Sequence, residues 1–291
     1  MRKVLFCFVC LFMGMAVYAQ NDVRLIRNAT LKIQYAGKTI LLDPMLGEKG
    51  TEMSALGVNL NPRVHLTMPV SEVLKGVDFV LLTHAHIDHY DPAAKRLISK
   101  NMPWYVQPAD YDSVAVKDHF RNTTVIKENV NVGGITIIRI AGNHGRGKLG
   151  EMMGASSGYV LKADGQPTLY VMGDCVWNEV TQKVVKEHQP EYIVVNSGGA
   201  ILPPMSKTDG PIIPNEAETM QIIDDCPVNT RFIAVHMDAI DHCQTTRAIL
   251  RNEARHHGTD MSRLIIPEDG ESGATDKPCG EGVRMLTQNC C

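Results

Sequence analysis

The stretch THAHIDHYD, residues 83–91, places three histidines and two aspartates within eight positions. It comes directly after DFVLL, residues 78–82, whose continuous apolar run predicts a fully buried strand. Side chains that follow such a strand lie at its carboxyl end, which is where α/β proteins place their sites. Because so many polar groups would be costly to bury without partners, the sequence predicts that they bind metal.

The spacing of this cluster suits two metal ions. His84 and His86 can face one ion, while Asp88 and His89 face another across the tight turn. A lone His-x-His pair would be explained better by surface histidines or by an adventitious metal patch. Four ligands of mixed imidazole and carboxylate type after an apolar strand favour a hydrolytic metal site.

The remainder of the chain alternates strand-like and helix-like segments, which is typical of the α/β class with two sheets and helices outside. Residues 31–43 predict a hairpin whose turn contains Gly37, and a helix is predicted to start at Pro92 with Asp91 as its N-cap. Further strands are expected at 104–107, 135–140, 158–163, 168–173, 192–196, 231–236 and 263–266, and further helices at 178–188, near 215–225 and at 243–256. No linker or short repeat interrupts them, so residues 20–291 are expected to form a single domain.

The first 19 residues have a different character. A basic start, MRK, is followed by the apolar run VLFCFVCLFMGMAV of 14 residues and by small residues before a cleavage position after Ala19. A membrane anchor is the alternative, but the run is shorter than the roughly 20 residues that span a bilayer. We therefore expect residues 1–19 to be a secretory signal peptide, and the mature protein to be exported, periplasmic or extracellular, and soluble.

The charge balance limits the partners of the mature chain. Cleavage removes Arg2 and Lys3 and no acid, so the formal net charge changes from −3 to −5. An acidic chain without a basic stripe does not favour nucleic acid, and no later apolar run is long enough to cross a membrane. The expected partner is a small-molecule substrate, and the oligomeric state is left open.

Six of the eight cysteines remain after cleavage. They are Cys175, Cys226, Cys243, Cys279, Cys290 and Cys291. In an exported chain they could pair, and the sequence alone permits 15 full connectivities. Three of them lie in the last 13 residues, so a local disulfide within the tail, about residues 269–291, is expected.

Five short motifs together resemble the metallo-β-lactamase fold superfamily. THAHIDH resembles its signature, AGNHG its third-histidine motif with His144, and LYVMGD the motif of its bridging carboxylate, Asp174. FIAVHMD resembles the last-histidine motif with His236, and ILLDP the early strand that supplies Asp43. The motifs occur in the family's order and span about residues 24–268.

This resemblance implies a fold and a set of metal ligands. The fold is a four-layer αββα sandwich with a dinuclear centre at one edge. One ion is held by His84, His86 and His144, a second by Asp88, His89 and His236, and Asp174 bridges them. Asp43 is expected to stand behind a ligand imidazole and bind its other nitrogen.

Departures from the family pattern indicate which branch of the superfamily the chain resembles. Asp174 occupies a position where true lactamases commonly carry cysteine or serine, and His86 stands where the flavo-diiron branch has glutamate. The stretches IRNATLKIQYAGKTILLDP and GDCVWN most resemble the ascorbate-6-phosphate lactonase-like branch. Relatives often have threonine at the position of Cys175, whose role is left open.

The chemistry implied is metal-dependent hydrolysis. Two divalent ions, with zinc favoured and manganese or iron as alternatives, share a water and lower its pKa toward neutrality. The resulting hydroxide attacks a carbonyl or phosphoryl centre. Asp88, which orients the nucleophile, and Asp174, which bridges the ions, are the catalytic candidates.

The substrate is expected to lie between two long aperiodic stretches, residues 44–70 and 197–214. Their methionines, prolines and leucines, including Met45 and Met68, predict a mainly apolar cleft. His242, His65 and Tyr90 are the candidate substrate contacts. A small ester-like substrate, a lactone in particular, is favoured. The alternatives are a phosphodiesterase of the same fold and a non-catalytic metal-binding protein, which the complete ligand set disfavours.

Overall fold

The structure is a computed structural model that describes residues 21–274. The predicted signal peptide and the tail cysteines Cys279, Cys290 and Cys291 lie outside the described residues. Among residues 21–274, Cys175, Cys226 and Cys243 are buried free thiols. No helix within that range combines the length and apolarity that a membrane crossing requires.

The first sheet comes mainly from the N-terminal part of the chain. Its strands are β1 (Asp22–Arg27), β2 (Thr30–Tyr35), β3 (Lys38–Leu42), β4 (Phe79–Leu82), β5 (Pro103–Val106), β6 (Asn122–Val125) and β14 (Ser272–Ala274), in the order β14-β1-β2-β3-β4-β5-β6. The predicted hairpin is β2–β3, in which Tyr35 pairs with Lys38 across the turn Ala36-Gly37. Both turn residues have positive φ, 49° and 77°, as a tight hairpin requires.

The second sheet also has seven strands. These are β7 (Asn129–Val132), β8 (Ile135–Asn143), β9 (Ala155–Lys162), β10 (Leu169–Val171), β11 (Tyr192–Asn196), β12 (Arg231–Val235) and β13 (Leu264–Ile265), in the order β13-β12-β11-β10-β9-β8-β7. Strands β10 to β12 are parallel, and β8 runs in the same direction because both β8 and β10 are antiparallel to β9. The carboxyl ends of β8, β10 and β12 therefore lie at one edge of this sheet.

The two sheets pack face to face over a shared apolar core. In β4, Phe79 and Leu81 belong to this core, whereas Val80 and Leu82 pack on the outer face of the same sheet. All four side chains are buried, which explains the continuous apolar run that predicted this strand.

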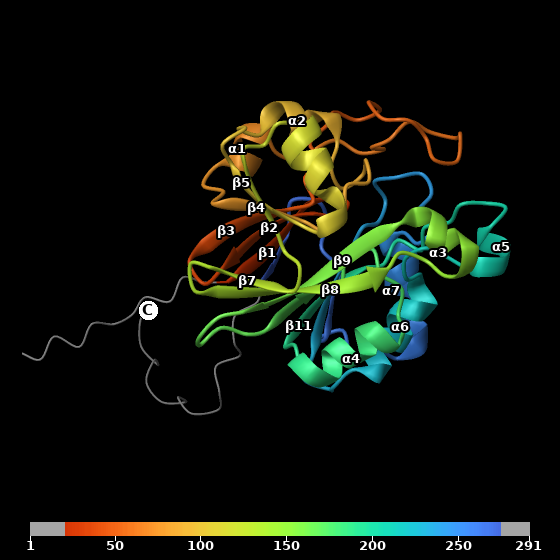
Figure 1. Cartoon of the computed structure of the whole chain (residues 1–291). Helices are drawn as coiled ribbons and strands as arrows, with labels where there is room; N and C mark the ends of the chain where they lie inside the picture. Colours follow the sequence, from red (N-terminus) through yellow and green to blue (C-terminus); the bar gives the residue numbers. More distant parts are fainter. Residues whose placement is uncertain (1–20, 275–291) are drawn as a thin grey trace, which may run out of the picture.

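Helices cover both outer faces, so the predicted four-layer αββα sandwich is confirmed (Figure 1). On the first sheet lie α1 (Val70–Leu74) and α2 (Pro92–Leu97), and on the second α4 (Glu179–His188), α6 (Glu216–Asp225) and α7 (Arg247–His257). The short helices α3 (Gly147–Met153) and α5 (Ser206–Asp209) lie beside each other at the edge, and a 3₁₀ turn (Pro108–Asp110) and a π-helical turn (Asp112–Lys117) follow β5.

Two helix starts show how local chemistry fixes the ends. Asp91 caps α2 as predicted, because its Oδ1 accepts a hydrogen bond of 2.7 Å from the Ala94 amide and Pro92 occupies the first helical position. The helix predicted from residue 243 instead begins at Arg247, with Thr246 as its N-cap. Residues 236–246 form a loop that carries side chains toward the site.

Candidate metal centre

Four candidate ligands follow the carboxyl ends of strands. His84 comes two residues after β4 and Asp174 three after β10, while His144 and His236 come directly after β8 and β12. This placement agrees with the strand reading of the sequence. His236 has a φ of 65°, a left-handed backbone conformation that is uncommon for a residue with a side chain.

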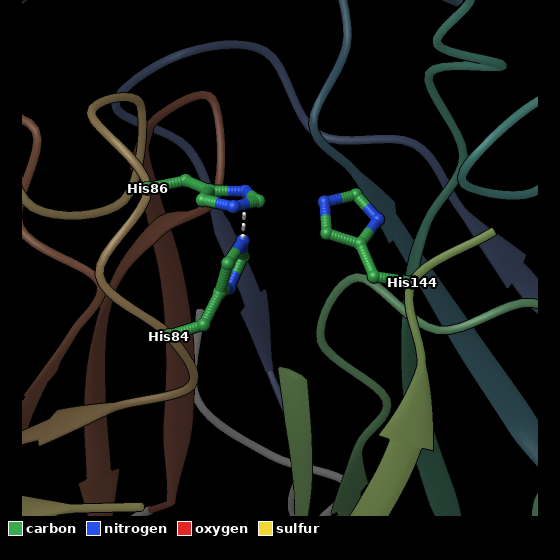
Figure 2. Close-up of side chains that lie close together, drawn as sticks. All are labelled: His84, His86 and His144. Carbon is green, nitrogen blue, oxygen red and sulfur yellow. Dashed lines mark hydrogen bonds between the residues drawn. The ribbon is translucent and has the colours of Figure 1, made fainter. Parts of the chain in front are cut away.

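The first group of ligands consists of three imidazoles, from His84, His86 and His144 (Figure 2). One ring nitrogen from each lies within 4.8 Å of the others, and His84 Nε2 is 3.0 Å from His86 Nδ1. Burial lowers the pKa of His84 well below its usual value and that of His144 to about 4. These rings are therefore neutral at pH 7 and offer free lone pairs to a metal. We call this group the imidazole set.

The second group contains two carboxylates and two imidazoles, from Asp88, His89, Asp174 and His236, again within 4.8 Å. His89 Nε2 lies 3.2 Å from Asp174 Oδ2, and His236 Nε2 lies 3.2 Å from Asp88 Oδ2. Burial opposes charge on His89, but the neighbouring aspartates outweigh burial and raise its pKa to about 10. We call this group the mixed set.

Asp174 contacts both sets. Its Oδ2 lies 3.4 Å from His144 Nε2 and 3.9 Å from His84 Nε2, and the same oxygen lies 3.2 Å from His89 Nε2. Its Oδ1 accepts a hydrogen bond of 2.5 Å from Asn196 Nδ2, which fixes the carboxylate between the sets.

The outer nitrogens of four ligand rings are also engaged. His89 Nδ1 lies 2.8 Å from Asp43 Oδ2, the partner expected from the sequence, and Asp43 itself accepts from the Thr83 amide and hydroxyl. The other three pairs are His84 Nδ1 with Thr83 Oγ1 at 3.0 Å, His144 Nδ1 with Ile212 O at 3.2 Å and His236 Nδ1 with Cys243 Sγ at 3.4 Å. These contacts turn the Nε2 atoms inward.

The donor chemistry of the two sets fits divalent metal. Three imidazoles in one set, and two imidazoles with two carboxylates in the other, match the nitrogen and oxygen ligands of zinc, manganese or iron. The pKa of Asp88 and of Asp174 is well below the usual range, because the nearby histidines outweigh the effect of burial. Both carboxylates are thus ionised and able to act as ligands.

The three candidate substrate contacts, His242, His65 and Tyr90, differ in their position and burial. His242 lies in the loop after β12 with 14% of its side chain exposed, and its pKa is lowered by burial, an effect that nearby Asp88 partly offsets. His65 is exposed on the loop before α1 and belongs to neither set. Tyr90 is a core residue, packed on Trp104 with its hydroxyl donating to Asp118, which argues against the expected substrate contact.

The two long loops, residues 44–70 and 197–214, pack against each other inside the protein. Met45 is fully buried among Leu149, Ile212, Ile213 and Ile240, so it joins the loops and cannot wall an open cleft. A cavity of about 570 Å³ instead lies beside His144, between residues 142–154 and Asn178.

Cys175 is buried against Gly142, and a Cβ added at Gly142 would come within 1.9 Å of the Cys175 Sγ. The Cys175 side chain therefore fills the space that Gly142 leaves open.

Residues 38–237 match the family model described as the beta-lactamase superfamily domain, so the chain belongs to this superfamily. The narrower family is UPF0173: the chain is 37% identical over 258 residues to the UPF0173 protein YddR of Bacillus subtilis, covering 86% of this chain and 98% of that one.

Two solved structures share both fold and sequence with the chain. One is described as a possible metal-dependent hydrolase from Veillonella parvula, with a TM-score of 0.83, 30% identity, and coverage of 88% of this chain and 100% of that one. The other is an isothiocyanate hydrolase from Delia radicum gut bacteria, with a TM-score of 0.80, 36% identity and the same coverage.

Proposed function

We propose that the chain is a metal-dependent hydrolase in which the imidazole set and the mixed set each hold one divalent ion. The observation that carries this proposal is the position of Asp174, whose carboxylate lies within 3.9 Å of imidazole nitrogens from both sets. Zinc is the favoured metal, with manganese and iron as alternatives.

The chain's own residues would divide the remaining work. The bound ions supply an acidified water and an electrophilic contact for the substrate. Asp88, with 14% of its side chain exposed, is the more accessible carboxylate and can orient the attacking water and hold its proton. Asp174, only 4% exposed, fixes the spacing of the two sets. Asp43 keeps His89 Nε2 directed inward by binding Nδ1.

The substrate is a small electrophile, and a lactone is the first candidate. The resemblance of the early strands and of GDCVWN to the ascorbate-6-phosphate lactonase-like branch supports it, as does an aspartate at position 174. A phosphodiester is expected to be a poorer substrate and β-lactams poorer still.

An isothiocyanate is the second candidate, supported by the 36% identity to the isothiocyanate hydrolase. In that reaction the water oxygen bonds to the central carbon of R–N=C=S. The carbon–nitrogen bond then breaks, the nitrogen takes both protons of the water, and the products are an amine and carbonyl sulfide. Asp88 is placed to pass a proton toward the leaving nitrogen.

One experiment tests both the metal-dependent hydrolysis and the choice of substrate. The protein from residue 20 onward is purified without added metal, its metal content is measured, and it is then assayed with a lactone, an isothiocyanate, a thioester, a phosphodiester and a β-lactam. Two equivalents of metal and hydrolysis lost on chelation are expected. Absence of bound metal after incubation with zinc, manganese or iron would refute the hydrolase, whereas activity on another panel member would refute only the substrate.

We also propose that the mature chain acts outside the cytoplasm as one domain, beginning near Gln20. The basic and apolar start of the sequence supports export. Fractionation and N-terminal sequencing of the native protein should find Gln20 at the amino terminus in an envelope or extracellular fraction. An intact Met1 in the cytosol would contradict this location.

A further inference from the structure

The outer nitrogen of His236 has an unusual partner. His89 is held from behind by a carboxylate, His84 by a hydroxyl and His144 by a backbone carbonyl, whereas His236 Nδ1 faces the thiol of Cys243 at 3.4 Å. Sulfur is a weaker acceptor than a carboxylate or carbonyl oxygen. The two imidazoles of the mixed set therefore receive very different support.

The backbone fixes the thiol in this position. The backbone of Cys243 forms an isolated antiparallel β-bridge with that of Ala200. The Thr245 amide also donates to the carbonyl of Gly198 at 2.9 Å. Gly198 leaves the space that the thiol fills: an added Cβ would lie 2.6 Å from Cys243 Sγ and 2.2 Å from the His236 carbonyl. Cys243 is 4% exposed, so water does not compete for the ring nitrogen.

The inner side of His236 is equally constrained. Its Nε2 lies 3.2 Å from Asp88 Oδ2 and 3.1 Å from His89 Nε2, inside the mixed set. A neutral ring that offers a lone pair at Nε2 must carry its proton at Nδ1, and Cys243 Sγ is the acceptor within reach of that proton. A thiol sulfur at 3.4 Å can accept that proton, so the contact is compatible with the tautomer that can bind metal.

We propose that Cys243 is a positioning residue that holds His236 in its metal-binding tautomer and orientation through an N–H···S hydrogen bond. This inference rests on the proposed function, because it takes His236 as a ligand of the second ion. It follows that His236 is the less firmly supported imidazole of the mixed set.

Replacement of Cys243 in the chain from residue 20 onward tests the inference. With Cys243→Ala, zinc affinity of the mixed set, measured by competition with a chelator, should fall about 10- to 100-fold, as for other residues behind metal ligands. Cys243→Ser restores an acceptor and should recover most of that loss. Affinity of the imidazole set should stay unchanged in both variants.

Cys226→Ala is the matched control, because Cys226 is also a buried free thiol but packs in the core between α6, α7 and the second sheet. It should leave both zinc affinities unchanged. Wild-type affinity in a folded Cys243→Ala protein would overturn the inference, and so would equal losses in the alanine and serine variants, which would indicate a packing role. Failure of the wild type to bind a second zinc ion would instead refute the proposed function.

A measurement on the wild type does not depend on the variants folding. In the zinc-loaded protein, nitrogen NMR of the histidine rings should show His236 bound through Nε2 and protonated at Nδ1, with slow exchange of that proton. Coordination through Nδ1, or a rapidly exchanging Nδ1 proton, would overturn the inference.

Discussion

The imidazole set and the mixed set use the same type of ring in opposite electrostatic surroundings. In the imidazole set, burial dominates and lowers the pKa of His84 and His144. In the mixed set, the aspartates outweigh burial and raise the pKa of His89 and His236. His84 and His144 face Asp174 alone, whereas His89 faces Asp174, Asp88 and Asp43, so the number of neighbouring carboxylates decides whether a buried histidine keeps its proton.

This difference has a consequence for the metal-free protein. Protons on His89 and His236 can balance Asp88 and Asp174 in place of a cation, so the mixed set is electrostatically satisfied without metal. In the imidazole set, burial keeps His84 and His144 neutral even though Asp174 Oδ2 lies 3.9 and 3.4 Å from their Nε2 atoms. At pH 7 a metal must therefore displace protons from His89 and His236, whereas His84 and His144 hold none to displace.

The largest expected effect follows from removing the carboxylate that joins the sets. Asp174→Ala should lose the second ion and lower kcat/KM by on the order of 10³-fold, because two cations would then repel each other without a shared anion. Metal analysis and steady-state kinetics check this. Asp164→Ala, at an exposed turn, is the control and should behave as wild type. Two equivalents of metal in the Asp174 variant would remove this residue from the centre.

Asp43→Asn should have a smaller effect that is largest at the mixed set, because Asp43 binds His89 directly and reaches His84 only through the Thr83 hydroxyl. The variant keeps a hydrogen-bonding oxygen behind His89 but removes the negative charge, so affinity for the second ion should fall about 10- to 100-fold. Chelator competition resolves the two ions. An equal loss at the imidazole set would mean that the sets are not independent.

The pH dependence of metal loading should differ between the sets. His89 has a pKa of about 10 and that of His236 is also raised, so second-ion affinity should rise by at least about tenfold per pH unit between pH 7 and 9 as the competing protons become rarer. His144, with a pKa of about 4, should make first-ion affinity nearly constant over the same range. Parallel slopes would contradict the proposed contrast.

Stability of the metal-free chain gives the mildest test. His144 has a lowered pKa, so its unfolded form binds a proton between pH 6.5 and about 4 when the folded form does not, and stability should fall as pH decreases through this window. His89 has a raised pKa, and its contribution, complete below pH 6.5, should be lost as pH rises toward 10. Denaturant unfolding with chelator should therefore show a maximum near pH 6.5. A profile that rises steadily with pH would exclude a charged His89.

His84, His144, Asp174 and His236 could be placed from the sequence because each follows a predicted strand, whereas the full ligand set came from the motif resemblance. Continuous apolar runs located β4, β10 and β12, and parallel strands bring their carboxyl ends to one edge. The strands β6 and β7 were missed because TTV and NVNV carry polar residues on a half-exposed surface. Their pairing depends on the neighbouring strands more than on their own composition.

The groups that contact the outer nitrogens of the ligand rings were harder to predict from the sequence. Ile212 acts through its carbonyl, which leaves no side-chain signature. Cys243 lies in a loop at the position where the sequence predicted the start of a helix. Met45 and Tyr90 were expected in a substrate cleft, but both are in the core. The sequence alone does not distinguish apolar residues that line a site from apolar residues that pack in the core beside it.

The placement of each ligand set on both sheets has a consequence for the chain as a polymer. An ion held by Asp88 and His236 would join residues about 150 positions apart, and one held by His84 and His144 would join residues about 60 apart. Such links act as reversible staples across the sandwich. A covalent link of the longer span restricts an unfolded chain by roughly 5 kcal/mol, so metal would serve the architecture of the two halves as well as their chemistry.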